Sequence, residues 1–493
     1  MALADVAPLL ALPETVWRGF ADHLRAIGVT EERVRPVVAA VADLHPVLRR
    51  PARNHHLRRL QHPAGYAMRM FFFADPVTED EARAALGDRL ATLLDAGLLR
   101  RLPDGSVVSP FVLALLDDLL LVSDDLTLGG EAVMGFGEST IELCRAAYTA
   151  KGKERVLDLG CGSGTLALAL ARPGSRVIAT DINPRALALT ELNARLNGLT
   201  NIETRQGDLL APVAGEELDL VVSQPPFVPR LEGAEGATFL YGGHVGDELA
   251  LSLLRGLAPR LAPSGRAVLR IDWPDRGDAP LESRLREALG EQGDLLVLRA
   301  PLVSPEDHAT AYAAGLHPVL DASFEREVER RLAHLQRAGI RGIFPTLTIV
   351  QKTGAARGRT HGLEVRPFGQ IHVTSERIDK LLAARSIAGD PSRLLAAQLR
   401  VPEGTVLAQE QVGPGAEVES TLVARFADTA LVPSMGITTD LLIAATLIHE
   451  APDVRGGLAR FAEHHEAPEE QVTLQLLPAV ERALLAGLLE VND

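Results

Sequence analysis

The chain has 493 residues, of which 46% are hydrophobic and only 4% are aromatic. At about 150 residues per domain, this length predicts roughly three domains with cores built mainly from Leu, Ala and Val. The formal net charge of −15 argues against a broad electrostatic grip on nucleic acid, whose phosphates favour clustered Lys and Arg, and leaves room only for a local basic patch.

The cysteines and the N-terminal sequence indicate a reducing compartment. Cys144 and Cys161 are the two cysteines of the chain, and they offer no disulfide framework. The N-terminal stretch has no basic region and carries Asp5 and Glu14 early, so we expect no signal peptide. No apolar run approaches the roughly 20 residues that a membrane span needs. We therefore predict a soluble, cytoplasmic protein with no membrane partner.

Residues 1–125 predict a helical domain that resembles a winged helix. Thr78 followed by Glu81 is a capping-box signal for the start of a helix pair. Asp104-Gly105 then gives the turn signal of a two-stranded hairpin. Helix, helix and wing are the parts of a winged-helix module, which can enter a DNA groove or dock a protein. The acidic composition favours the docking use here.

A basic run extends from Arg49 to Arg59 within this domain. A solvated helix face is the simplest interpretation, and binding of RNA or an acidic protein is the alternative. The histidines in and around the run have no acid or cysteine at ligand spacing, so we predict no metal site.

Residues 126–355 alternate between predicted strands and helices. The stretches RVLDLG, RVIATD, NIETRQGD, DLVVSQ and AVLRIDW are predicted strands. Repeated βα units imply a parallel sheet with helices on both faces, which is a Rossmann-like, doubly wound α/β fold. The helix that starts near residue 247 is predicted to end at Gly265. Trp273 follows the last of these strands, where it would either line a pocket or be buried.

Residues 356–493 give a weaker signal. GLEVRPFGQIHVT is strand-like and ERIDKLLAARSI is helical. We predict a C-terminal accessory domain of the α+β class.

A glycine loop follows the first strand of the α/β region, in LDLGCGSGT. Gly160, Gly162 and Gly164 lie between the strand and a helix that starts at Thr165. Glycine lets the backbone approach a ligand without a Cβ clash. Asp158, two residues before the first glycine, can face the loop. The loop alone is weak evidence, because a dinucleotide site such as an NAD site begins similarly.

Two further acids follow at the ends of the next strands. Asp181 ends the second strand about 20 residues on, where an acid can hold two ribose hydroxyls, and Asp208 ends the third. This ordered trio resembles class I S-adenosylmethionine methyltransferases. The resemblance implies that Asp158 helps to place the methionine end of S-adenosyl-L-methionine, Asp181 the ribose and Asp208 the adenine. Ile182 and Leu209 are the neighbouring cofactor contacts that we expect.

The fourth strand ends in the motif QPPF. An amide or exocyclic amine nitrogen is a poor nucleophile, and carbonyl groups that accept its N–H bonds orient it and favour the charge that develops on it. Gln224 would supply a side-chain carbonyl, Pro225 and Pro226 would fix the backbone, and Phe227 would stack on a planar substrate. A plain strand end without catalysis is the alternative.

The motif resembles that of class I enzymes that methylate planar nitrogen, which is Asn or Asp, usually Asn, then Pro-Pro and then Tyr or Phe. Gln224 departs from it by one methylene, which shifts the carbonyl by roughly an ångström. The surroundings are similar to the protein N5-glutamine methyltransferases that modify release factors. Gly242, Gly243 and Asp247 correspond to a motif there, and GFGESTIEL, from Gly135 to Leu143, corresponds to a cofactor-covering segment.

This resemblance covers about residues 130–275, which also resemble ribosomal RNA guanine-N2 methyltransferases. It implies methylation of a protein side-chain amide or of a nucleobase amine, with a protein or RNA substrate. A small-molecule O- or N-methyltransferase of secondary metabolism is an alternative. Another is a winged-helix binding protein whose core only senses the cofactor. The sequence does not predict an oligomeric state.

Overall fold

The computed structural model describes residues 3–43, 46–125, 131–148, 154–233, 239–317, 319–354, 358–411, 420–427 and 430–492. Tertiary contacts divide the chain into two units. The first comprises residues 1–297 and 302–361, and the second comprises residues 298–301 and 362–493. The boundary predicted at residue 125 falls inside the first unit, so the division into three domains stays a prediction. No helix in the described ranges is long and apolar enough to cross a membrane.

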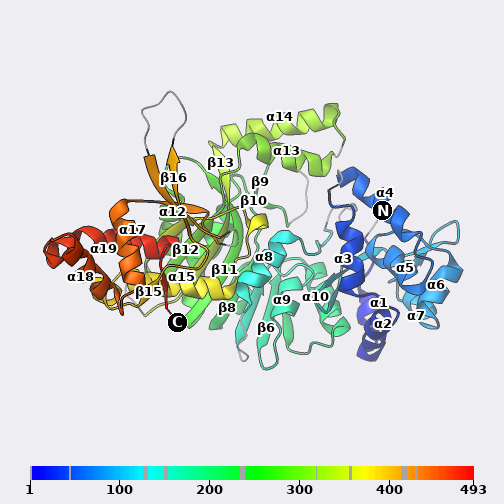
Figure 1. The fold of residues 1–493 in the computed structure, drawn as a ribbon. Coiled ribbons are helices and arrows are strands. Elements are labelled where there is room, and N and C mark those ends of the chain that lie inside the picture. The colour runs from blue at the N-terminus through cyan, green and yellow to red at the C-terminus, as the bar shows by residue number, and fades with distance from the viewer. Residues whose placement is uncertain are drawn as a thin grey trace. The chain divides into compact units, whose positions relative to one another are not determined.

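An eight-stranded sheet has the strand order β14-β12-β13-β11-β8-β5-β6-β7 and lies in the first unit except for the last residues of β12 and β14 (Figure 1). Its strands are β5 (Arg155–Leu159), β6 (Arg176–Asp181), β7 (Ile202–Gln206), β8 (Leu218–Ser223), β11 (Leu261–Asp275), β12 (Asp294–Arg299), β13 (Gly342–Gln351) and β14 (Thr360–Glu364). The strands β7, β6, β5, β8 and β11 run parallel, as predicted. The order reverses at β5, as in a doubly wound fold.

Two details of the predicted α/β region are wrong. The sheet is mixed, because β13 lies antiparallel to β11. The helices α13 (Pro305–Leu316) and α14 (Ala322–Arg337) precede β13 and run as a pair. Gly265 does not end the preceding helix, since α11 (Glu248–Leu257) stops earlier and passes through a 3-10 turn into β11. Pro259 lacks the N–H that would continue α11.

Helices cover both faces of the sheet. The pleat of β5 places Leu157 among the side chains that pack beneath α11 and α12 (Leu281–Leu289). The next residue, Asp158, points to the opposite face, where its Oδ2 accepts the Ala167 N–H of α9 (Thr165–Leu170) at 2.8 Å. The helix α10 (Pro184–Leu196) contacts α9, β6 and β7.

The N-terminal residues form a helical cluster with two hairpins. Its helices are α1 (Ala7–Leu10), α2 (Glu14–Ala26), α3 (Glu31–Ala39), α4 (Pro46–Leu57), α5 (Pro63–Ala67), a π-helical turn (Met68–Phe72), α6 (Glu79–Leu86) and α7 (Arg89–Asp95). Its strands are β1 (Arg100–Arg101), β2 (Val107–Val108), β3 (Phe111–Leu116) and β4 (Leu119–Asp124). The Thr78–Glu81 capping box and the β1–β2 hairpin are present as predicted. A winged-helix role stays a prediction.

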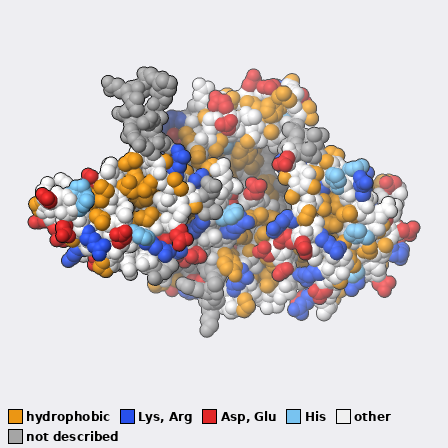
Figure 2. Space-filling model, in the orientation of Figure 1, with side chains coloured by type: hydrophobic (Ala, Val, Ile, Leu, Met, Phe, Trp, Pro, Cys, Tyr) orange, Lys and Arg blue, Asp and Glu red, His pale blue; other side chains and the backbone are white. Residues whose placement is uncertain are grey.

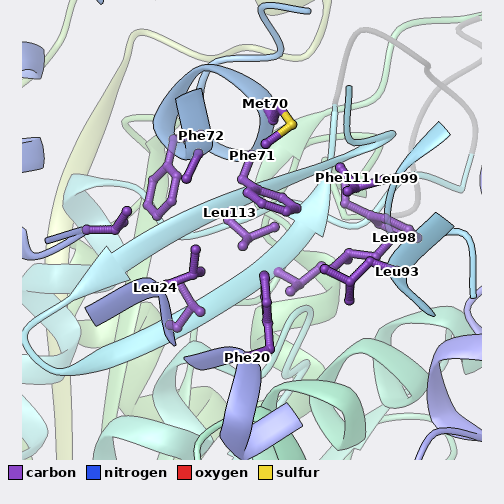
Figure 3. Packing of buried hydrophobic residues seen from close by; sticks show 14 of the residues in the cluster. Phe20, Leu24, Met70, Phe71, Phe72, Leu93, Leu98, Leu99, Phe111 and Leu113 are labelled. Atoms are coloured by element: carbon purple, nitrogen blue, oxygen red, sulfur yellow. The ribbon is translucent and has the colours of Figure 1, made fainter. Parts of the chain in front are cut away.

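Aromatic and aliphatic side chains from this cluster pack into one core (Figure 3). The rings of Phe20 and Phe71 meet edge to face, with their centroids 5.4 Å apart. Leu189 and Leu192 of α10 belong to the same core, although α10 is part of the α/β region. The N-terminal cluster and α10 of the α/β region therefore share one buried core.

Polar side chains of α10 join β4 to the α/β region. Asn193 exchanges two hydrogen bonds with the backbone of Val122, at 2.7 and 2.9 Å. Asn197 does the same with Leu120, at 2.9 and 2.8 Å. About two turns before Asn193, Arg185 makes a largely buried ion pair with Asp124 at 2.6 Å.

The second unit is of the predicted α+β class. Its helices are α15 (Ser375–Ala388), α16 (Pro391–Leu395), α17 (Thr439–His449), α18 (Val454–His464) and α19 (Glu469–Ala486). Its strands β16 (Val406–Gln411), β17 (Ser420–Arg425) and β18 (Ser434–Ile437) form an antiparallel sheet, and β15 (Leu399–Arg400) pairs with β19 (Glu490–Val491). Buried leucine, alanine and valine side chains of α17, α18 and α19 form its core.

Candidate functional site

A cavity of about 580 Å³ lies at the carboxyl ends of β5, β6 and β8 and next to the turn after β7. The carboxyl ends of parallel strands meet at one edge of a sheet, which is where ligands bind in doubly wound folds. Figure 2 shows the surface hollowed beneath α13 and α14, with hydrophobic side chains around the hollow. The only charged side chains among the described lining residues are Asp181 and Asp208.

Most of the predicted site residues line this one cavity. They are Gly160, Gly162, Asp181, Ile182, Asp208, Leu209, Gln224, Pro225, Pro226 and Phe227. We call the part around the first six residues, which the sequence analysis assigned to a cofactor, the cofactor half, and the part around the last four, which it assigned to a substrate, the substrate half. Two predicted residues, Asp158 and Gly164, are not among the described lining residues.

Asp158 is fully buried behind the glycine loop. Its Oδ2 holds the first turn of α9, and its Oδ1 has no hydrogen-bond partner among the described residues. Burial raises the pKa of this carboxyl to about 7, and the charge of Asp181 adds to the rise. The side chain thus supports the loop from behind and does not face the cavity.

Gly164 permits close packing of two helices. It has a φ of +83°, and a Cβ at this position would lie 2.8 Å from the Thr190 side chain on α10. A larger residue would push α9 away from α10 and distort the loop that precedes α9. Gly164, the third glycine of the loop, therefore allows α9 and α10 to pack closely behind the cavity.

Asp181 is oriented by the backbone of its neighbours. Its Oδ2 accepts the Gly162 N–H at 3.0 Å and its Oδ1 accepts the Asn183 N–H at 2.9 Å. Burial raises its pKa in spite of these hydrogen bonds. A carboxylate has about four acceptor positions, so this one keeps acceptor capacity toward the cavity. Leu209, at the turn after β7, has a φ of +45°, which is a strained conformation for leucine.

The QPPF motif is fixed on two sides. Gln224 Nε2 donates a hydrogen bond to Ser139 Oγ of α8 (Glu138–Ala147) at 2.8 Å. Before the motif, the buried Ser223 hydroxyl donates to the Leu159 carbonyl at 2.8 Å, which joins the ends of β8 and β5. The motif therefore begins at a well-anchored point of the sheet.

The glycines that follow the motif pack against its backbone. A Cβ at Gly242 would collide with the Pro226 carbonyl oxygen, and one at Gly246 would lie 2.5 Å from the Phe227 carbonyl oxygen. The short strands β9 (Val228–Pro229) and β10 (Tyr241–Gly243) pair in parallel within this loop, with one register shift. Asp247, just beyond it, makes a buried ion pair with Arg284 at 2.7 Å.

The cavity has further lining residues that the sequence analysis did not name one by one, and we count them with the substrate half. They are Thr140, Phe239, Leu240, Tyr241, Leu249 and Tyr312. Tyr312 comes from α13, and its ring lies 4.6 Å from the ring of His308 and 5.4 Å from the guanidinium of Arg331. Burial raises the pKa of the Tyr312 phenol well above its usual range. Its hydroxyl has no hydrogen-bond partner among the described residues.

Trp273 is fully buried in β11 and does not line the cavity. Its indole N–H donates to Thr348 Oγ1 at 3.2 Å. Of the two interpretations of Trp273, the structure supports the buried one.

Known proteins resemble the part of the chain that builds the cavity. Residues 142–238 match the family of the methyltransferase small domain. A release factor glutamine methyltransferase of Deinococcus radiodurans is 37% identical over 173 residues, which cover 33% of this chain and 59% of that protein. Another, from Moorella thermoacetica, is 42% identical over 135 residues, which cover 25% of this chain and 47% of that protein. The chain thus spans about half the length of the curated relatives it matches.

Among solved structures, a coclaurine N-methyltransferase bound to N-methylheliamine and SAH is 15% identical to this chain. The alignment covers 46% of this chain and 76% of that protein, with a TM-score of 0.27.

Proposed function

We propose that this chain, whose residues 142–238 form a methyltransferase small domain of the class I type, uses S-adenosylmethionine to methylate a planar nitrogen. The observation that carries the proposal is the single cavity that joins the glycine loop to the QPPF motif. A cofactor in one half would meet a substrate nitrogen in the other without crossing solvent.

The residues of the cofactor half fit S-adenosylmethionine. Gly160 and Gly162 have positive φ values, which a turn close to a ligand requires. Asp181 would hold the ribose hydroxyls with its remaining acceptor positions, and Asp208 would accept from the adenine amine. Ile182, which is 55% exposed, would cover the adenine ring. When bound, S-adenosylmethionine supplies a methyl group on a positively charged sulfur and becomes neutral S-adenosylhomocysteine.

The substrate half suits an uncharged, flat group. Its described lining has aromatic rings at Phe227, Phe239, Tyr241 and Tyr312 and carries no charged side chain. Gln224 Oε1 would accept an N–H of the substrate and aim the nitrogen lone pair at the methyl group. The nitrogen forms a bond to the methyl carbon as the carbon–sulfur bond breaks, and it then loses one proton to water.

A protein side-chain amide is the substrate class that we favour. The net charge of −15 opposes broad contact with a nucleic acid, and the release factor glutamine methyltransferases are similar to this chain around the cavity. A nucleobase amine presents the same N–H donor and is the second candidate.

The test is incubation of the purified protein with radiolabelled S-adenosylmethionine and a cell lysate, followed by protease or nuclease treatment of separate portions. We expect label in a fraction that protease removes. Label that only nuclease removes would replace the amide with a nucleobase. An absence of transferred label, with S-adenosylmethionine still bound, would overturn the proposed activity.

A further inference from the structure

We infer that Ser139 is a positioning residue that holds the Gln224 side chain with its Oε1 toward the substrate. This inference rests on the proposed function and extends it to a residue outside the QPPF motif. Ser139 Oγ lies 2.8 Å from Gln224 Nε2. Gln224 lines the cavity, whereas Ser139 is not among its described lining residues. Ser139 therefore acts on the substrate only through Gln224.

The amide of glutamine has two chemically opposite ends. Its nitrogen is a double donor and its oxygen a double acceptor, and rotation of the terminal torsion by half a turn exchanges them. With Nε2 bound to Ser139, Oε1 is the end left for the cavity. The exchanged amide would present N–H groups to a substrate N–H, which is a repulsive arrangement. The bond from Nε2 to Ser139 therefore leaves Oε1 free to accept the substrate N–H.

The extra methylene of glutamine makes this bond a useful constraint. A longer side chain has one more rotatable torsion, so its carbonyl is held less well by the backbone alone. Ser139 removes that freedom from the outside. We infer that the Gln224–Ser139 pair together performs the task for which class I enzymes of this type use the shorter asparagine.

The helix that carries Ser139 is itself held against the sheet. Ser139 is the second residue of α8, and one turn later Glu142 makes an ion pair with Arg270 of β11 at 3.3 Å. Leu143 and Ala146 of α8 are fully buried. The serine oxygen therefore has a defined position relative to the end of β8.

One consequence concerns the substrate. A site whose acceptor end is fixed selects nucleophiles that carry an N–H, such as a primary carboxamide or an exocyclic amine. It disfavours a nitrogen without hydrogen, which would leave Oε1 facing a lone pair.

The test compares Ser139→Ala and Ser139→Thr in two backgrounds, the natural Gln224 and Gln224→Asn. Label transfer into lysate from radiolabelled S-adenosylmethionine gives the rate. With Gln224, we expect Ser139→Ala to lower the rate by about 10–100-fold, because a small misplacement of a reacting group has effects of this size. Ser139→Thr keeps the hydroxyl and should therefore retain most of the natural rate.

In the Gln224→Asn background the side chain is one methylene shorter, so its amide is expected not to reach Ser139 Oγ. We expect Ser139→Ala to change the rate by less than about threefold there, which is the double-mutant coupling expected for residues in contact. Equal losses in both backgrounds would overturn the inference, because they would indicate a general structural defect. Ser283→Ala is the matched control, since Ser283 is an exposed serine in the first turn of α12.

A second measurement does not depend on activity. In protein labelled with ¹⁵N-glutamine, the side-chain NH₂ signal that Gln224→Glu removes belongs to Gln224. We expect Ser139→Ala to shift this signal and Ser283→Ala to leave it unchanged. An unmoved signal would overturn the Ser139 bond. The two measurements distinguish the two possible failures. A natural protein that shows the bond but transfers no label would overturn the proposed function, whereas a protein that transfers label without the bond would overturn only the inference about Ser139.

Discussion

The two halves of the cavity are built in different ways. The cofactor half comes mostly from turns that directly follow β5, β6 and β7, so its residues lie beside predicted strand ends. The substrate half adds Thr140 from α8, Phe239 and Tyr241 from the loop around β10, and Tyr312 from α13. Local sequence therefore specifies the first half, and tertiary contacts between distant segments specify the second. This difference suggests that cofactor and substrate recognition can be changed separately.

The largest difference between the effect on turnover and the effect on cofactor binding is expected at Gln224. Gln224→Ala removes the acceptor for the substrate N–H, and we expect turnover to fall by about 10²–10³-fold, the usual effect of losing one oriented polar group in an active site. Binding of S-adenosylmethionine should change by less than twofold. Label transfer and calorimetry measure the two quantities. Turnover that survives the change would show that Gln224 has no part in the chemistry.

Asp181 tests the opposite half. Asp181→Ala removes the carboxylate that we assign to the ribose, and we expect binding of S-adenosylmethionine to weaken by about 1–3 kcal/mol. Calorimetric titration of the purified protein measures the change. Because Gly162 and Asn183 lose their acceptor too, Asp181→Asn is the companion variant, and it should weaken binding less. Unchanged affinity in both variants would exclude the ribose role.

Asp158 supports the cofactor half from behind, and its effect depends on pH. Its folded pKa of about 7 lies above the usual value of about 3.9 in an unfolded chain, so between these values the folded state keeps a proton that the unfolded state has released. The stability that this proton contributes is complete below pH 4 and is lost as the pH rises through 7.

We therefore expect the free energy of unfolding of the natural protein to fall between pH 5.5 and pH 8 by about 1–2 kcal/mol more than that of Asp158→Asn, which cannot titrate. Urea unfolding at the two pH values, without cofactor, measures this difference. Parallel pH profiles of the two proteins would contradict it. A constant offset would not, since an asparagine in a buried site has its own desolvation cost.

The smallest effect is expected at Tyr312, in the substrate half. Tyr312→Phe removes a hydroxyl that has no protein partner among the described residues, and we expect kcat/KM for labelled lysate substrate to fall by about 2–10-fold, the usual value of one hydrogen bond. Affinity for S-adenosylmethionine should not change. Tyr148→Phe is the control, because Tyr148 is exposed and stacks on Arg172 away from the cavity lining. Equal effects of both variants would remove Tyr312 from the substrate site.

Much of the α/β region could be predicted because its signals are local. The buried strands are continuous apolar runs, and the glycines and acids that end them have a fixed spacing. The direction of β13 could not be predicted, since a strand of the same composition fits either way and the preceding helices decide its direction. The face of the sheet to which Asp158 points could not be predicted either, because it depends on the pleat of β5 and on the position of α9.

The substrate half was only partly predictable, for a physical reason. Phe239 and Tyr241 lie just before Gly242 and Gly243, yet nothing local shows that they line the same cavity as Phe227. Tyr312 lies in an ordinary helix, and only the folding of α13 over the sheet edge brings it to the cavity. Ser139 gave no signal either, because the hydrogen bond that it makes joins residues 85 positions apart.

The two asparagines of α10 have a consequence for how this protein can be divided. Asn193 and Asn197 each offer a donor and an acceptor to β4, two residues apart along the strand, so the helix imitates the next strand of a sheet. An uncovered strand edge is a template for pairing with other chains. Separating the N-terminal cluster from the α/β region would open that edge and invite aggregation. We therefore expect the two parts to fold as one unit. An exchange of the N-terminal cluster between related proteins would have to include Asn193 and Asn197.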